Sequence, residues 1–139
     1  MDLQPQLLVV ANSPALVEDI LAWVIPEGYH PVVATTFEAG NLHLRTNPRA
    51  VITQLRLNQY NGLHLALHAR QAGIPAVVIG EADAVLERDA SQLGATFVKR
   101  GELGRERIVA LLQDLAPAPC GAVEQAEGAA PARRPANLP

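Results

Sequence analysis

Residues 50–80, AVITQLRLNQYNGLHLALHARQAGIPAVVIG, contain the pattern that decides the fold. Two short apolar runs, 50–54 and 74–80, are typical of strands buried on both faces of a parallel sheet. Between them, residues 62–73 are predicted to form a helix, because the segment ends in a glycine that is a C-cap signal. A strand, a helix and a second strand in this order predict a crossover unit of a parallel sheet.

The same alternation extends in both directions from this unit. Strands are predicted over 6–11, 29–36, 50–54, 74–80 and 95–99, and helices over 12–28, 37–47, 62–73, 84–94 and 103–115. Ser13 and Pro14 suit the N-cap and first turn of a helix, whereas Pro31 favours an edge strand. The pattern predicts an α/β fold, a doubly wound five-stranded parallel sheet in the flavodoxin-like order 2-1-3-4-5 with helices on both faces.

The last 24 residues differ in composition from the rest of the chain. Residues 116–139 contain eight Ala and five Pro and show no apolar periodicity. Such a segment buries too little surface to offset the entropy cost of ordering it. The sequence therefore predicts one folded domain over 5–115 and an Ala/Pro-rich flexible tail over 116–139. Cys120 falls in this tail and is a poor candidate for a nucleophile.

Composition argues against several classes of protein. The net charge of −3 argues against a nucleic-acid or membrane-surface partner, because such proteins normally carry a basic patch. No apolar run approaches the roughly 18 residues of a membrane span, and no basic region precedes the first apolar run as in a signal peptide. A single cysteine cannot form an internal disulfide, so a cytoplasmic location is expected.

Three stretches carry a resemblance to a known family. The segment PRAVITQLRLNQYNGLHLALHAR, 48–70, matches without gaps the family pattern around an acceptor strand and the helix after it. IPAVVIG, 74–80, and LGATFVKR, 93–100, match the fourth strand and the segment at the fifth. In this order and spacing the chain resembles, over about 6–115, the receiver domains of bacterial two-component response regulators.

The resemblance implies a phosphoryl-transfer site, and this sequence departs from it. In the family an aspartate accepts a phosphoryl group from a histidine kinase, an acidic pair helps it hold Mg²⁺, and a Thr or Ser hydroxyl contacts the phosphoryl oxygens. The matching positions here are Gln54, then Ala11 with Asn12, and Gly80. A glutamine amide cannot form an acyl phosphate, and none of these residues supplies a carboxylate for Mg²⁺. We therefore expect no phosphoacceptor, no catalytic residue, no bound metal and no cofactor, and a protein that is not an enzyme.

The family's conserved lysine has two candidates here. Either Lys99 or Arg100 matches its place, and Lys99 is the only lysine of the chain. Without carboxylates to pair with, the Lys99 ammonium is expected near the Gln54 carbonyl or in water. With Lys99 and Arg100, the residues Ala11, Asn12, Gln54 and Gly80 would line a vestigial pocket. Glu81 and Asp83 are the nearby carboxylates, and we expect them to be solvated loop charges.

Two further groups of residues are candidates for a metal site or a partner surface. His64 and His68 are four residues apart on a predicted helix, a metal-ligand spacing, but no third ligand follows, so both are expected to be surface residues. The resemblance implies that receivers dimerise or dock on partners through the surface from helix four over strand five to helix five. On that surface the candidate contact residues are Arg88, Glu102, Arg105 and Glu106. Trp23 is expected to pack against the core.

Three functions follow from this pattern. The leading hypothesis is an atypical stand-alone receiver domain that acts in signal transduction as a phosphorylation-independent protein-interaction module. Its partner would be a histidine kinase, an output protein, another regulator, or a second copy of the chain. One alternative is a sensor of a small ligand or anion in the vestigial pocket. The other is a phosphoreceiver with a relocated acceptor, ranked last because Thr53 should face the core.

Overall fold

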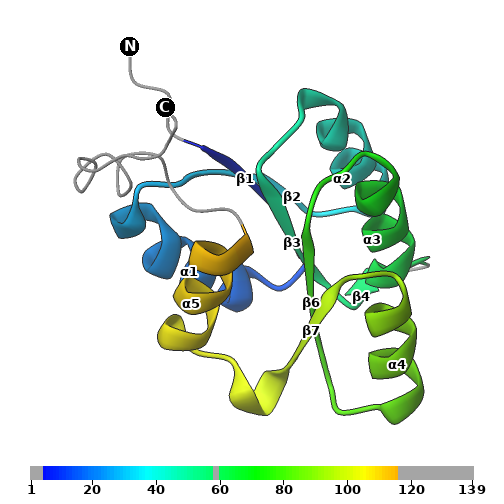
Figure 1. The fold of residues 1–139 in the computed structure, drawn as a ribbon. Coiled ribbons are helices and arrows are strands. Elements are labelled where there is room, and N and C mark those ends of the chain that lie inside the picture. The colour runs from blue at the N-terminus through cyan, green and yellow to red at the C-terminus, as the bar shows by residue number, and fades with distance from the viewer. Residues whose placement is uncertain (1–4, 58–59, 116–139) are drawn as a thin grey trace, which may run out of the picture.

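The computed structural model describes residues 5–57 and 60–115. They form a five-stranded parallel sheet in the order β2-β1-β3-β6-β7, with helices on both faces (Figure 1). The strands are β1 (Gln6–Val10), β2 (His30–Ala34), β3 (Ala50–Gln54), β6 (Ala76–Gly80) and β7 (Thr96–Lys99). Numbered along the chain, these five strands have the order 2-1-3-4-5, so the predicted fold class and strand order are confirmed. The tail 116–139, with Cys120, lies outside the described residues.

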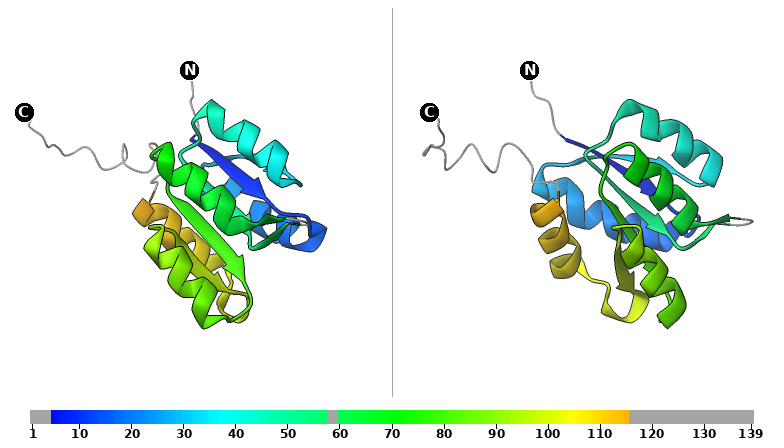
Figure 2. Two further views of the ribbon diagram at one scale, coloured as in Figure 1. Left: turned by 90° about the vertical axis from the view of Figure 1, so that its right-hand side faces the viewer. Right: turned by 45° about the vertical axis from the view of Figure 1, so that its right-hand side comes forward.

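The two faces of the sheet are covered by different helices. In Figures 1 and 2, α1 (Pro14–Val24) and α5 (Arg105–Leu115) lie together on one face. The other face is covered by α2 (Phe37–His43), α3 (Gly62–Gln71) and α4 (Ala84–Gln92). Leu7 and Val9 of β1 pack on the α1/α5 side, and Leu8 and Val10 pack on the opposite side. Because both faces are buried, the strand has a continuous apolar run and not an alternating one.

Capping side chains set the start of the helices that follow β1 and β2. Ser13 accepts a hydrogen bond from the Leu16 N–H and Pro14 is the first residue of α1, as predicted. Thr36 accepts from the Ala39 N–H at the start of α2, which ends β2 earlier than the predicted boundary at 36. Thr36 therefore acts as a helix cap and not as a strand residue.

Helix ends also differ from the predicted ranges. The segment predicted as one helix over 12–28 divides into α1 and a 3-10 turn, η1 (Ile25–Glu27), followed by Gly28 at φ 95°. The segment predicted over 37–47 divides in the same way into α2 and η2 (Leu44–Thr46). A 3-10 last turn satisfies the carbonyl groups that a helix leaves unpaired at its C-terminus.

Two short strands and the edge strand complete the description. A small antiparallel hairpin, β4 (Arg56–Leu57) with β5 (Tyr60–Asn61), lies between β3 and α3 and was not predicted. β2 pairs only with β1, so Pro31 lies on an edge strand as expected. Trp23 packs against the core beneath α1, also as expected. Within the described residues, no helix has both the length and the apolar character needed to cross a membrane.

Candidate functional site at the carboxyl end of the sheet

The parallel strands bring most of the predicted site positions to one edge of the sheet. In the strand register, Val10 is opposite Thr53, Gln54 is opposite Ile79, and Gly80 is opposite Lys99. The residues that follow β1, the last residues of β3 and β6, and the end of β7 therefore meet at the carboxyl edge. This edge is where open α/β sheets usually bind ligands.

Gln54 holds two parts of this edge together. Its side-chain Oε1 accepts a hydrogen bond of 2.9 Å from the backbone N–H of Asn12, 42 positions earlier in the chain. The preceding residue, Ala11, is buried and donates its N–H to the Ala34 carbonyl. The Asn12 side chain is exposed. The β1–α1 connection is thus fixed by neutral hydrogen bonds to β3 and β2.

Gly80 has no space for a side chain. A Cβ atom at this position would lie 2.8 Å from Leu55 Cδ2, 2.9 Å from Leu55 Cβ and 3.3 Å from Phe97 Cζ. Leu55 is only 3% exposed, so it cannot turn out into solvent without leaving the core. The volume in which a Thr or Ser hydroxyl would lie is therefore filled by the residue after Gln54.

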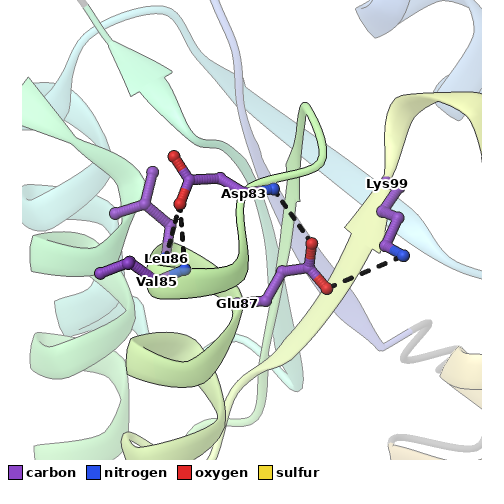
Figure 3. Close-up of polar contacts among 5 residues, drawn as sticks. All are labelled: Asp83, Val85, Leu86, Glu87 and Lys99. Atoms are coloured by element: carbon purple, nitrogen blue, oxygen red, sulfur yellow. Dashed lines mark hydrogen bonds and ion pairs between the residues drawn. The ribbon is translucent and has the colours of Figure 1, made fainter.

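Lys99 does not point toward Gln54. Its Nζ lies 3.9 Å from Glu87 Oε1 on α4 (Figure 3). Glu87 Oε2 in turn accepts a hydrogen bond of 3.0 Å from the Asp83 N–H. Of the two expected positions of the ammonium, near the Gln54 carbonyl or in water, the solvent-exposed one agrees with the structure, and α4 adds a carboxylate that the sequence alone does not place beside β7. With side chains 41% and 29% exposed, this pair is a surface ion pair, worth about 0–1 kcal/mol.

Asp83 has a structural role that was not predicted. Its Oδ1 accepts hydrogen bonds of 3.0 Å and 3.2 Å from the N–H groups of Val85 and Leu86 (Figure 3). It is the N-cap of α4, so its carboxylate is not merely a solvated loop charge. The signal was available in the sequence, since an aspartate directly precedes the predicted helix.

A pocket of about 220 Å³ lies at this edge. Residues 54–56 line one side, residues 79–83 form its base and rim, and Leu86 and Arg100 complete it. Gln54, Gly80 and Arg100 thus belong to the pocket, whereas Ala11, Asn12 and Lys99 are not among its lining residues. Arg56 was missed because the hairpin that places it there was not predicted.

The donor set at this edge does not fit Mg²⁺. Gln54 Oε1 is used by the Asn12 N–H, and the Asp83 carboxylate is used at the start of α4. Glu81 alone supplies a carboxylate without a hydrogen bond or ion pair inside the described ranges. Among residues 5–57 and 60–115, no group of three or more His, Cys, Asp and Glu could hold a metal ion. Mg²⁺ demands near-octahedral oxygen coordination and is usually held by one or two carboxylates together with water or phosphate oxygens.

The two histidines of α3 pack against α2. The Phe37 ring lies 6.4 Å from the His64 ring and 5.7 Å from the His68 ring, measured between ring centroids. His68 Nδ1 is 2.8 Å from Asn41 Oδ1, which makes a hydrogen bond between the two helices. His64 is exposed and His68 is half-buried. The pair therefore contributes to the α2–α3 contact.

The four residues of the predicted partner face are all exposed. Arg88 lies on α4, Glu102 on η3 (Arg100–Glu102), and Arg105 and Glu106 on α5. Arg105 Nη2 lies 2.9 Å from Glu27 Oε2, so this arginine also links the start of α5 to η1. Its side chain is 55% exposed, so the ion pair leaves it on the open surface.

Comparison with known proteins identifies the fold. No protein-family model and no curated protein sequence matches the chain. Among solved structures, a signal receiver domain from Vibrio parahaemolyticus is 19% identical with a TM-score of 0.73, over 91% of this chain and 99% of that one. A response regulator receiver protein from Pseudomonas putida is 23% identical with a TM-score of 0.72, over 82% and 99%.

A third solved structure of similar fold contains a bound magnesium ion. The receiver domain of a sensor histidine kinase from Pseudomonas aeruginosa is 18% identical to this chain, with a TM-score of 0.69 over 81% of this chain and 98% of that one. That domain holds a magnesium ion in its active-site cleft. At these identities the likeness establishes the receiver fold for this chain.

Proposed function

We propose that the chain is an atypical receiver domain of two-component signalling that works as a phosphorylation-independent protein-interaction module and not as an enzyme. The observation that carries the proposal is the hydrogen bond from the Asn12 N–H to Gln54 Oε1. It gives the residue at the acceptor position a fixed structural partner. An amide cannot carry an acyl phosphate, and this amide also holds the β1–α1 connection in place.

The packing at Gly80 supports the same proposal independently. A phosphoryl group at residue 54 would need a hydroxyl at the end of β6 to contact its oxygens. Leu55 and Phe97 fill the space that such a side chain would use. The acceptor position and the hydroxyl position have thus both been taken over by contacts within the protein.

These internal contacts favour a single conformation of the carboxyl edge. A ligand shifts a conformational equilibrium only by its difference in affinity for the two states. With no phosphoryl group or metal to bind, the surface that a partner recognises would be constant unless the partner itself selects a state. We propose that this surface includes Arg88, Glu102 and Glu106, and that its partner is a histidine kinase, an output protein, another regulator or a second copy of the chain.

Phosphorylation is tested by incubating the full chain with acetyl phosphate and Mg²⁺ and measuring its intact mass. We expect no mass increase under conditions in which a receiver domain that has its acceptor aspartate gains one phosphoryl group. A hydroxylamine-labile increase of one phosphoryl group would overturn the proposal, because that lability identifies an acyl phosphate.

The interaction surface is tested by charge reversal. Arg88→Glu and Glu106→Lys should weaken binding of the purified partner, or the self-association seen by sedimentation velocity. Glu38→Lys on α2 is a matched control, since Glu38 is exposed and α2 packs against β1 and β2, away from β7 and α4. Equal binding by all three variants would exclude the α4–β7–α5 surface.

Of the two alternative functions, one has a structural observation in its favour and the other has one against it. A small-ligand sensor is favoured by the pocket between Gln54 and Arg100. A relocated phosphoacceptor at Thr53 is disfavoured, because this residue is 0% exposed and its hydroxyl donates to the Gln54 carbonyl. The sensor is therefore retained as the second candidate.

A further inference from the structure

The pocket above the end of β6 has an arginine on each side. Arg56 follows β3 and Arg100 follows β7, and β6 lies between these two strands in the sheet. The two residues therefore reach the pocket from opposite sides of Gly80. Neither guanidinium has an ion pair or a hydrogen bond within the described ranges. Lys99, in contrast, is paired with Glu87 and does not line the pocket.

The pocket lining carries two guanidiniums and two carboxylates, so its formal charge is zero, and the two carboxylates differ in their contacts. Of the two acidic residues in its lining, Asp83 is committed to the N–H groups at the start of α4, where the helix dipole offsets its charge. Glu81 is exposed and has no ion pair in the described part of the chain. Two guanidiniums against one uncommitted carboxylate match a monoanion better than a phosphate dianion.

The other residues that line the pocket supply one more hydrogen-bond donor and several apolar side chains. Because Gln54 uses Oε1 to accept from the Asn12 N–H, its amide NH2 is left as a donor on a residue that lines the pocket. Leu55, Ile79 and Leu86 contribute apolar surface. The volume of about 220 Å³ is below the roughly 300–1,000 Å³ of typical drug-sized sites, so the occupant should be small.

We propose that this pocket binds a small monocarboxylate with an apolar body, without Mg²⁺. Arg56, Arg100 and the Gln54 amide would hold the carboxylate, because a guanidinium presents paired N–H donors in the plane that a carboxylate requires. The apolar body would lie over Leu55, Ile79 and Leu86. This inference rests on the pocket and on the sensor alternative, so its failure would leave the interaction-module proposal intact.

The test is a titration of the ¹⁵N-labelled full chain with sodium benzoate, free of Mg²⁺ and at constant ionic strength. We expect saturable amide shifts centred on residues 54–56 and 79–83. The double variant R56Q/R100Q should bind about a hundredfold more weakly, since it loses two charged contacts and each is worth about one power of ten. E81Q should bind more tightly, because it removes the opposing charge. R107Q is the matched control and should bind like the wild type, since Arg107 is exposed on α5 away from the pocket.

Several results would overturn the proposal. Absence of saturable shifts with benzoate would do so, as would equal affinity in the R56Q/R100Q variant. Tighter binding of inorganic phosphate than of benzoate would reject the monocarboxylate class, and equal binding of benzyl alcohol would reject the carboxylate requirement. A urea unfolding curve establishes that the double variant is folded, and the opposite sign expected for E81Q provides a second readout.

Discussion

The two halves of the carboxyl edge are built from different kinds of contact. On the β1–β3 half, the Gln54 amide and the Asn12 N–H close the edge with a neutral hydrogen bond. On the β6–β7 half, Glu81 and Arg100 line a pocket together with Arg56 from the segment after β3, and none of the three has an ion pair in the described residues. One half has become structural, whereas the other keeps charged groups that could serve a ligand.

The difference lies in how each half satisfies its polar groups. The Asn12 N–H at the end of β1 needs an acceptor, and the Gln54 amide oxygen meets this requirement on the β1–β3 half. On the β6–β7 half the space near Gly80 was filled by Leu55, which excludes a hydroxyl but leaves the rim above it open.

The largest expected loss of stability is for a substitution at Gly80, where the two halves of the carboxyl edge meet. Gly80→Ala should destabilise the protein by about 1–3 kcal/mol, because its Cβ would overlap Leu55 in a well-packed region. Urea unfolding measures the change. Gly101→Ala is the matched control, since no atom lies within 4 Å of a Cβ at Gly101, and it should stay within about 0.5 kcal/mol of the wild type. Equal costs at both positions would show that Leu55 does not fill this space.

Gln54→Ala should have the next largest effect. It removes the acceptor of the Asn12 N–H, and losing this exposed hydrogen bond should cost about 0.5–1.5 kcal/mol. Gln54→Glu is the matched control, because a carboxylate of the same length can accept the same hydrogen bond. The contrast is measured by urea unfolding together with hydrogen exchange of the Asn12 amide. Unchanged exchange in Gln54→Ala would mean that the hydrogen bond does not hold the connection.

A smaller effect is expected for Glu87→Gln on the β6–β7 half. The amide can still accept from the Asp83 N–H, so the substitution removes mainly the charge that faces Lys99. Because the pair is exposed, the loss should be about 0–1 kcal/mol and should vanish at about 1 M salt, where the screening length is about 3 Å. Glu18→Gln on α1 provides a matched exposed control. A loss that persists at high salt would point to a packing role for Glu87.

The fold could be predicted from the sequence because its signals are local and repeated. The apolar runs of β1, β3 and β6 and the cap at Ser13 depend only on neighbouring residues. The predicted ends of strands and helices were less accurate where one residue suits either of two adjacent elements. Thr36 fits a strand by its β-propensity, but its hydroxyl caps α2.

The candidate site could be predicted only in part. Alignment of the strand ends was sufficient to bring Gln54 and Gly80 to the same edge. The sequence could not show that Leu55 would occupy the space at Gly80, nor that Glu87 would lie across from Lys99. Both contacts depend on the spacing between elements in three dimensions, which a one-dimensional pattern does not contain.

The smallest expected change is in the binding of Mg²⁺. Restoring a single carboxylate with Gln54→Asp should not produce Mg²⁺ binding, because Ala11 and Asn12 still supply no carboxylate at the end of β1. The aspartate is also one methylene shorter, so it should lose the hydrogen bond to the Asn12 N–H and part of the stability that Gln54 provides. Calorimetric titration with MgCl2 is the measurement, with the magnesium-binding receiver from Pseudomonas aeruginosa as the positive control. Saturable magnesium uptake by this variant at millimolar concentration would show that the β6–β7 half, through Glu81, can complete a metal site by itself. In that case the two halves of the edge would be less independent than their contacts indicate.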